Sequence, residues 1–264
     1  SNDLPEHSPE ILASMLERIR HRGPDGQGHF IDRNQGVALG HTRLSINDPA
    51  GGCQPLHAVD GRYVLTTNGE FYDFKRHRAT LMADGDRFLS KSDSEIAIGL
   101  YRKYGLDFTR HLRGEFAFAL YDTREDELIL LRDRFGVRPL FYHISQDGKT
   151  IHYGSEVKAV LAHPDVPAKF DPKAALHQLM QTIAPGMSAF KNVISLDPGC
   201  FLRVRKRGGR LDISQHRYWD FDFPPEEAHR EEHREEEHVE RIRAELIDAI
   251  VLRLEADVPV GSYL

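Results

Sequence analysis

Short β-rich runs separated by Gly, Asn and Asp fill much of residues 36–153, and this pattern constrains the fold more than any other feature of the chain. The connections are mostly of hairpin length, which joins neighbouring strands in antiparallel fashion. Helical spacing is found at residues 94–104 and 155–162, where it does not alternate with single strands. The pattern predicts an α+β fold with antiparallel sheets rather than a series of βαβ units. We expect strands at residues 36–46, 62–72, 115–121, 127–132, 140–144 and 150–153.

The first residues predict one surface helix. Ser8, Pro9 and Glu10 suit the N-cap, N1 and N2 positions, and the apolar residues that follow fall on one helical face. The breakers from Arg22 to Gly26 then predict a tight turn.

The character of the sequence changes after Pro167. We expect a helix over residues 171–181 and a hairpin formed by residues 193–204 and 211–219. The charge run at 226–238 continues into an amphipathic helix, whose inward residues should be Val239, Ile242, Leu246, Ile250 and Leu254. We therefore divide the chain into a first domain at 1–222, a linker at 223–231 and the start of a second domain at 232–264.

Composition excludes several classes of protein. The 264 residues are 40% hydrophobic and 29% charged, which is typical of a soluble globular protein. The longest uncharged apolar stretch, Phe116 to Tyr121, is far too short for a membrane span, and the first residues lack the character of a secretory signal. The formal charge of -6 disfavours nucleic acid as a partner. We expect a cytoplasmic protein with neither a membrane nor a nucleic-acid partner.

Metal and thiol chemistry have little support. His229 and His233 match the H-x-x-E-H spacing of some zinc peptidases, but they lie in a His- and Glu-rich run that favours a solvated helix face. Neither Cys53 nor Cys200 has the surroundings of a known cysteine motif, and a lone internal Cys is more often a small buried hydrophobe. We predict no metal site.

Three polar positions allow both a structural and a functional interpretation. Asn68-Gly69 suits a turn, but an amide side chain beside a Gly N–H could also donate two hydrogen bonds to an oxyanion. Arg43 could be a solvated residue on the polar face of a strand, and Asp93 could belong to a simple helix N-cap. Taken singly, these residues leave both interpretations open.

Taken in order, these positions belong to blocks that resemble one family. The sequence is similar to the glutaminase half of glutamine-dependent asparagine synthetases, which are class II amidotransferases. The blocks are Arg20-His21-Arg22-Gly23-Pro24-Asp25, Arg43-Leu44-Ser45-Ile46, Asn68-Gly69-Glu70-Phe71-Tyr72, Ser92-Asp93-Ser94-Glu95, residues 113–119 and residues 132–140. Gly154-Ser155-Glu156-Val157-Lys158-Ala159 and Tyr218-Trp219 also match, so the resemblance covers nearly the whole chain.

The resemblance implies an N-terminal-nucleophile hydrolase fold, an αββα sandwich, followed by an ATP-pyrophosphatase-type α/β synthetase domain. In that family an N-terminal Cys attacks the glutamine amide. By motif, Arg43 would hold the α-carboxylate of glutamine and Asp93 its α-ammonium group, while Asn68 and Gly69 would form the oxyanion hole. Glu70 and the backbone of Leu44, Ser45, Ile46 and Asn47 would line the glutamine pocket.

The chain departs from the family pattern in two places. A family member should carry its Cys on a first strand, whereas this chain opens with Ser1, close to the Arg20 block. Either a strand and turn of roughly ten residues lie outside this sequence, or the nucleophile has been lost. The retention of the glutamine-binding residues favours the first alternative. Asp73 also stands where family members often carry Asn.

The C-terminal residues 257–264 resemble the strand that leads into the pyrophosphate loop of the synthetase domain. ATP and Mg²⁺ are thus implied for that domain and no cofactor for this segment, although Leu264 is a candidate contact to adenine as well as a buried strand residue. We expect a glutamine-hydrolysing, ATP-dependent amide synthetase, with aspartate as the default acceptor and a homodimer as one possible assembly. A tailoring amidotransferase acting on a natural-product carboxylate, or a relative whose N-terminal domain is a scaffold, is the alternative.

Overall fold

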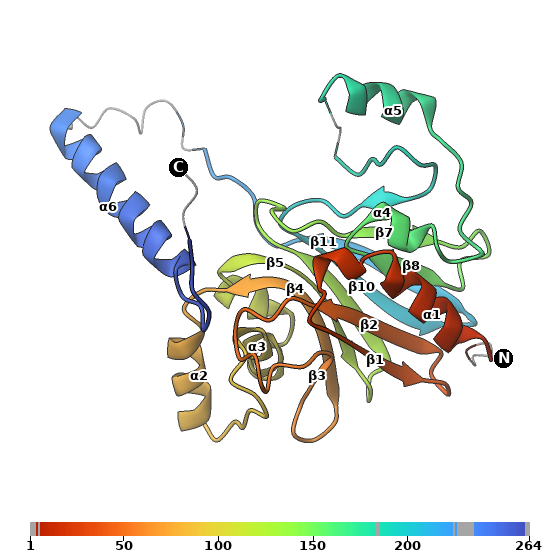
Figure 1. Cartoon of the computed structure of the whole chain (residues 1–264), viewed down its shortest axis with the longest axis horizontal. Helices are drawn as coiled ribbons and strands as arrows, with labels where there is room; N and C mark the ends of the chain where they lie inside the picture. Colours follow the sequence, from red (N-terminus) through yellow and green to blue (C-terminus); the bar gives the residue numbers. More distant parts are fainter. Residues whose placement is uncertain (1–3, 5, 183–184, 224, 226–234, 262–264) are drawn as a thin grey trace.

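Two layers of antiparallel sheet lie between two layers of helix in this protein (Figure 1). The computed structural model describes residues 4, 6–182, 185–223, 225 and 235–261. The α+β class and the αββα arrangement predicted from the sequence are confirmed.

The larger layer is a six-stranded sheet with the strand order β11-β10-β6-β5-β4-β3. Within this sheet, β4 and β5 pair in register from Tyr63 opposite Asp122 to Phe71 opposite Gly114. The strands are β3 (Leu56–His57), β4 (Tyr63–Phe71), β5 (Gly114–Asp122), β6 (Glu127–Arg132), β10 (Cys200–Arg207) and β11 (Arg210–Arg217).

The second layer has two separate pieces. One is the hairpin of β1 (Gly26–Asp32) and β2 (Val37–Arg43), and the other is a three-stranded sheet with the order β8-β7-β9. The strands of this sheet are β7 (Phe141–Ile144), β8 (Ile151–Gly154) and β9 (Ile194–Ser195). Within the described residues, β2 has β1 as its strand partner and β8 has β7, so each of them also forms an edge.

Period-two alternation along the central strands gives the large sheet two buried faces. On β5, Phe118 and Leu120 pack in the cluster beneath the helices, while Ala117 and Ala119 pack against the second layer of strands. Both faces of β4 and β5 are thus covered, which holds their backbone firmly in place.

Helices cover the outer faces (Figure 1). The helices α2 (Phe74–Ala83) and α3 (Ile96–Tyr104) pack together on the large sheet, whereas α1 (Ser8–Glu17) and α4 (Val157–Val160) cover the second layer. Two further helices, α5 (Pro172–Leu179) and α6 (Glu235–Arg253), project from the layers. Short 3-10 turns occupy Arg20–Arg22, Asp93–Glu95 and Gly105–His111.

Most predicted elements are present, with shifted ends. The strand predicted at 127–132 is β6 with the same bounds, and Asp171 caps α5 through its side chain. The assignment of Ser8 as an N-cap was wrong, because His7 precedes the helix and Ser8 is its first residue. The elements β1 and α2 were not predicted.

The expectation that α6 buries its apolar face was also wrong. The five residues expected to point inward are each more than half exposed, although Asp248 forms a salt bridge with Arg113 and Arg253 packs over the ring of Tyr72. These exposed residues are Val239, Ile242, Leu246, Ile250 and Leu254. No helix in the described part of the chain is both long and apolar enough to cross a membrane.

Candidate functional site

Asn68 and Gly69 lie inside the continuous strand β4, so the turn interpretation of this dipeptide is wrong. Their partners on β5 are Ala117 and Phe116. Gly69 adopts a φ of +143°, and a Cβ atom there would stand 2.0 Å from the carbonyl oxygen of Glu115. Glycine is therefore required at this position.

The side-chain nitrogen of Asn68 is buried and has no hydrogen-bond partner among the described residues. A buried N–H group without an acceptor is costly, and such groups are rare in folded proteins. The side-chain amide of Asn68 is therefore available to donate a hydrogen bond to a ligand.

Arg43 ends β2 and is buried, with 8% of its surface exposed, so its interpretation as a solvated strand residue was wrong. Its Nη2 atom donates to the carbonyl oxygens of Asn47 and Asp48 at 3.1 and 2.6 Å. Its Nη1 atom donates to the carbonyl oxygen of Pro49 at 3.2 Å and lies 3.8 Å from the sulfur of Cys53. The guanidinium group thus organises the loop that follows its own strand.

Asp93 lies on the other side of this loop, in a 3-10 turn whose N-cap is Ser92. One carboxylate oxygen accepts a hydrogen bond of 2.8 Å from the backbone N–H of Phe71, and the side chain of Asn47 also bonds this carboxylate. Burial raises the pKa of Asp93, since only 3% of the residue is exposed. Asp93 therefore lies in a capped turn and also places its carboxylate at the site.

Glu70 follows the Asn-Gly pair on β4. Burial raises its pKa, and the neighbouring carboxylates of Asp93 and Glu115 act in the same direction. Arg138 and Arg253 oppose this shift, and Arg138 forms a 2.7 Å ion pair with Glu115.

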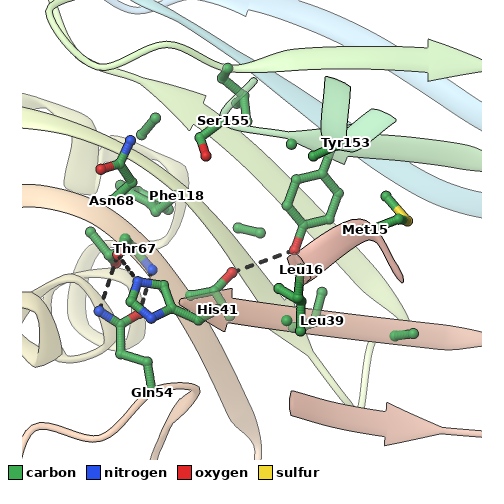
Figure 2. Close-up of a pocket in the computed structure, with 18 of the residues that line it drawn as sticks. Met15, Leu16, Leu39, His41, Gln54, Thr67, Asn68, Phe118, Tyr153 and Ser155 are labelled. Atoms are coloured by element: carbon green, nitrogen blue, oxygen red, sulfur yellow. Dashed lines mark hydrogen bonds between the residues drawn. The ribbon is translucent and has the colours of Figure 1, made fainter. Parts of the chain in front are cut away.

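Two residues that sequence reasoning missed hold the strand just before Asn68. The Nε2 atom of His41 lies 2.8 Å from the carbonyl oxygen of Thr67, and the amide of Gln54 bonds both the N–H and the carbonyl of Thr67 at 2.6 and 3.0 Å (Figure 2). Burial lowers the pKa of His41 to about 4, so its imidazole is neutral at pH 7. His41 could have been noticed because it precedes Arg43 by two positions on an alternating strand.

These residues line one cavity of about 640 Å³ between the two layers of strands. Figure 2 shows Asn68 on the large sheet, Leu39 and His41 on β2, and Tyr153 on β8 around this space. The cavity is polar at the Arg43 and Asp93 end, and it continues as an apolar groove between β2 and β8 beneath α1.

Most of the predicted site residues reach this cavity. Ser45 does not line it, and its backbone N–H instead donates to the carboxylate of Asp25 at 2.8 Å. Leu264, His229 and His233 lie outside the described residues. In the described part of the chain, no cluster of three or more His, Cys, Asp or Glu side chains is arranged to hold a metal ion. The predicted residues along the cavity are Arg43, Leu44, Ile46, Asn47, Asn68, Gly69, Glu70 and Asp93.

Comparison with known families gives a match over residues 2–219 to the glutamine amidotransferase domain. This chain belongs to the class II glutamine amidotransferase family. The family assignment from the sequence motifs is thereby confirmed.

Curated relatives of this amidotransferase domain have two kinds of name. The amidase chry2 of Gibberella zeae is 39% identical over 259 residues, covering 97% of this chain and 37% of the relative. The amidase chyE of Penicillium rubens is 38% identical over 267 residues, covering 100% and 38%. The glutamine-hydrolysing asparagine synthetase 3 of Bacillus subtilis is 33% identical over 260 residues, covering 97% and 40%. The chain thus spans well under half the length of these relatives.

Solved structures support the fold. An allosteric regulatory enzyme of purine biosynthesis aligns with a TM-score of 0.60 at 19% identity, covering 82% of this chain and 48% of that one. The glutamine phosphoribosylpyrophosphate amidotransferase of Bacillus subtilis aligns with a TM-score of 0.57 at 19% identity, covering 83% and 48%. At this identity the likeness supports the N-terminal-nucleophile hydrolase fold alone.

Proposed function

We propose that this domain hydrolyses glutamine and supplies the released ammonia to an ATP-dependent amide synthetase of which it is a part. The buried side-chain nitrogen of Asn68, which has no acceptor among the described residues, carries this proposal. In the reaction a thiolate attacks the amide carbon of glutamine and the carbonyl oxygen becomes negatively charged. Asn68 and the backbone N–H of Gly69 would donate to that oxygen, which is the interaction that most lowers the barrier in acyl transfer.

The charges at the polar end of the cavity suit the two ends of glutamine. The buried carboxylate of Asp93 is an acceptor for the α-ammonium group, and such charge-assisted contacts are strong. Arg43 is the counterpart for the α-carboxylate. Because its Nη atoms also bond the carbonyl groups of residues 47–49, we propose that it fixes this loop as well as the substrate.

We further propose that the nucleophile is the Cys of a strand that lies in the groove between β2 and β8. Both strands present an edge to this groove, and a strand between them would join the two pieces of the second layer into one sheet. Its thiol would attack glutamine, ammonia would leave with a proton from the α-amino group, and water would hydrolyse the thioester to glutamate. Cys53 does not serve this role in the proposal, because it is exposed and does not line the cavity.

The acceptor of the ammonia is the finer part of the proposal. We propose an adenylated carboxylate, with aspartate as the default, and ATP and Mg²⁺ bound by the synthetase domain that would follow. A tailoring role on a natural-product carboxylate is the second candidate, because two relatives that are 39% and 38% identical are named amidases.

The test uses the full-length protein with glutamine labelled with ¹⁵N in its amide group. We expect release of glutamate, and transfer of the label to aspartate or to a second carboxylate when ATP is present. Diazo-oxo-norleucine should alkylate the N-terminal Cys and abolish this activity while ammonia-dependent synthesis continues. A full-length protein that neither hydrolyses glutamine nor forms the adduct would support the scaffold alternative instead.

A further inference from the structure

The segment that follows α6 returns to the loop after β2. The backbone N–H of Asp257 donates to the carbonyl oxygen of Ile46 at 3.2 Å. One carboxylate oxygen of Asp257 accepts from the backbone N–H of Asp48 at 2.8 Å. A single residue thus bonds the loop on both sides of Asn47, from more than 200 positions away in the sequence.

Asn47 is the residue that this contact brackets, and it connects both charged groups of the site. Its side chain bonds the carboxylate of Asp93, and its carbonyl oxygen accepts from Arg43 at 3.1 Å. Loss of the contact from Asp257 would free the backbone that positions Asn47 between Arg43 and Asp93.

Asp48 strengthens the connection. It has a φ of +47°, a left-handed conformation that non-glycine residues seldom adopt. Its carbonyl oxygen accepts from Arg43 at 2.6 Å, and its carboxylate accepts from the backbone N–H groups of Gly51 and Lys91 at 3.0 and 2.8 Å. Asp257 satisfies its N–H group, so each polar group of Asp48 is bonded and the loop has one defined shape.

The last residue of α6, which leads into this segment, lies beside the residue that follows β4. Arg253 packs over the ring of Tyr72 at 5.4 Å, and its charge acts on Glu70. Glu255 forms an ion pair with Lys75 on α2. Residues 253–257 therefore extend from Tyr72, just after the strand that carries Asn68 and Gly69, to the loop that surrounds Arg43.

We propose that Asp257 is a positioning residue for glutamine, and that through it the segment after α6 sets the affinity of the pocket for glutamine. The inference rests on the proposed glutaminase function. Since we assign residues 232–264 to the start of the synthetase domain, movement of that domain would act on glutamine binding through two hydrogen bonds. Linkage is reciprocal, so bound ligand should in turn hold this segment in place.

The kinetic test compares three variants of the full-length protein in glutamine hydrolysis. We expect Asp257→Ala to raise the KM for glutamine about five- to tenfold, the lower range of coupling between linked sites, with kcat within about twofold. Asp257→Asn keeps an oxygen acceptor for the N–H of Asp48 and should restore a KM near that of the wild type. The control Glu240→Ala removes an exposed carboxylate of α6 that pairs with Arg243 and does not contact the loop, and it should leave the KM unchanged.

Hydrogen exchange provides a readout that does not depend on turnover. Glutamate, the proposed product, should slow exchange in the peptide containing the amide of Asp257 in the wild type, and have a smaller effect on that peptide in Asp257→Ala. A wild-type KM in Asp257→Ala, or a fall in kcat without a change in KM, overturns the inference. If the wild-type protein does not hydrolyse glutamine, the proposed function fails first, and the inference fails with it.

Discussion

Replacement of Asn68 by Ala separates catalysis from stability. The structure gives the side-chain nitrogen of Asn68 no acceptor among the described residues, so the substitution breaks no hydrogen bond formed by that atom. An unsatisfied buried polar group costs about 1–3 kcal/mol, and its removal relieves that cost. We therefore expect the melting temperature of Asn68→Ala to equal or exceed that of the wild type by a few degrees.

The same change should severely impair glutamine hydrolysis. Loss of one oxyanion donor typically lowers kcat by ~10²- to 10³-fold, or about 2.7 to 4 kcal/mol of barrier. The KM for glutamine should stay within severalfold, because Arg43 and Asp93 remain to bind the two charged ends of the substrate. Asn68→Asp is the sharper probe, since it places a carboxylate where the oxyanion forms, close to Glu70.

The assay measures glutamate release and ammonia-dependent synthesis side by side in the full-length protein, with thermal unfolding recorded for each variant. Synthesis from added ammonia should stay normal, because it bypasses glutamine hydrolysis. Asn34→Ala, which changes an exposed Asn in the turn between β1 and β2, is the matched control and should change neither rate. Wild-type kcat in Asn68→Asp would refute the assignment of an oxyanion donor.

Three further predictions follow from single contacts. Asp93→Asn keeps an acceptor for the backbone N–H of Phe71 but removes the charge, so steady-state kinetics should give a roughly ten- to hundredfold higher KM for glutamine; an unchanged KM would argue against an ammonium contact. Gly69→Ala forces a Cβ atom against the carbonyl of Glu115 and should lower stability by about 1–3 kcal/mol in denaturant unfolding, whereas wild-type stability would contradict the close approach. Burial lowers the pKa of His41 to about 4, so the neutral imidazole contributes stability that is fully present above about pH 6.5 and is lost as the pH falls towards 4. His41→Gln should reduce this pH dependence of the melting temperature, and a pH profile identical to that of the wild type would contradict the assignment.

The sequence predicted those parts of the fold in which local pattern and tertiary packing agree. The strand at 127–132 has a continuous apolar run at 128–131, the pattern of a strand that is buried on both faces, and both faces are buried in the structure. The helix α2 was missed because Phe74 and Leu81 are its buried residues, which is too few for an apolar stripe. The strand β1 was missed because its two glycines are unfavourable in strands, and its pairing with β2 compensates.

The site was predictable in its residue types but not in its supporting contacts. Motifs identified Arg43, Asn68 and Asp93, and the structure places all three along one cavity. The hydrogen bonds of His41 and Gln54 to Thr67 depend on the packing of β2 over β4, which a local sequence pattern cannot predict. Ser45 does not line this cavity, and its backbone N–H donates to Asp25 instead. A motif does not tell which backbone groups of a loop face the cavity.

Apart from the proposed nucleophile, the residues to which we assign glutamine binding and oxyanion stabilisation lie on one continuous stretch of the chain, from His41 to Asp93. A stretch of this kind can be inherited as a unit, so mutations elsewhere can change the acceptor that receives ammonia without disturbing its release. This separation suits a family whose members are named both asparagine synthetases and amidases. Asp257 contacts this stretch from far along the chain. A mutation near Asp257 that changes the product would therefore also have to preserve the proposed release of ammonia.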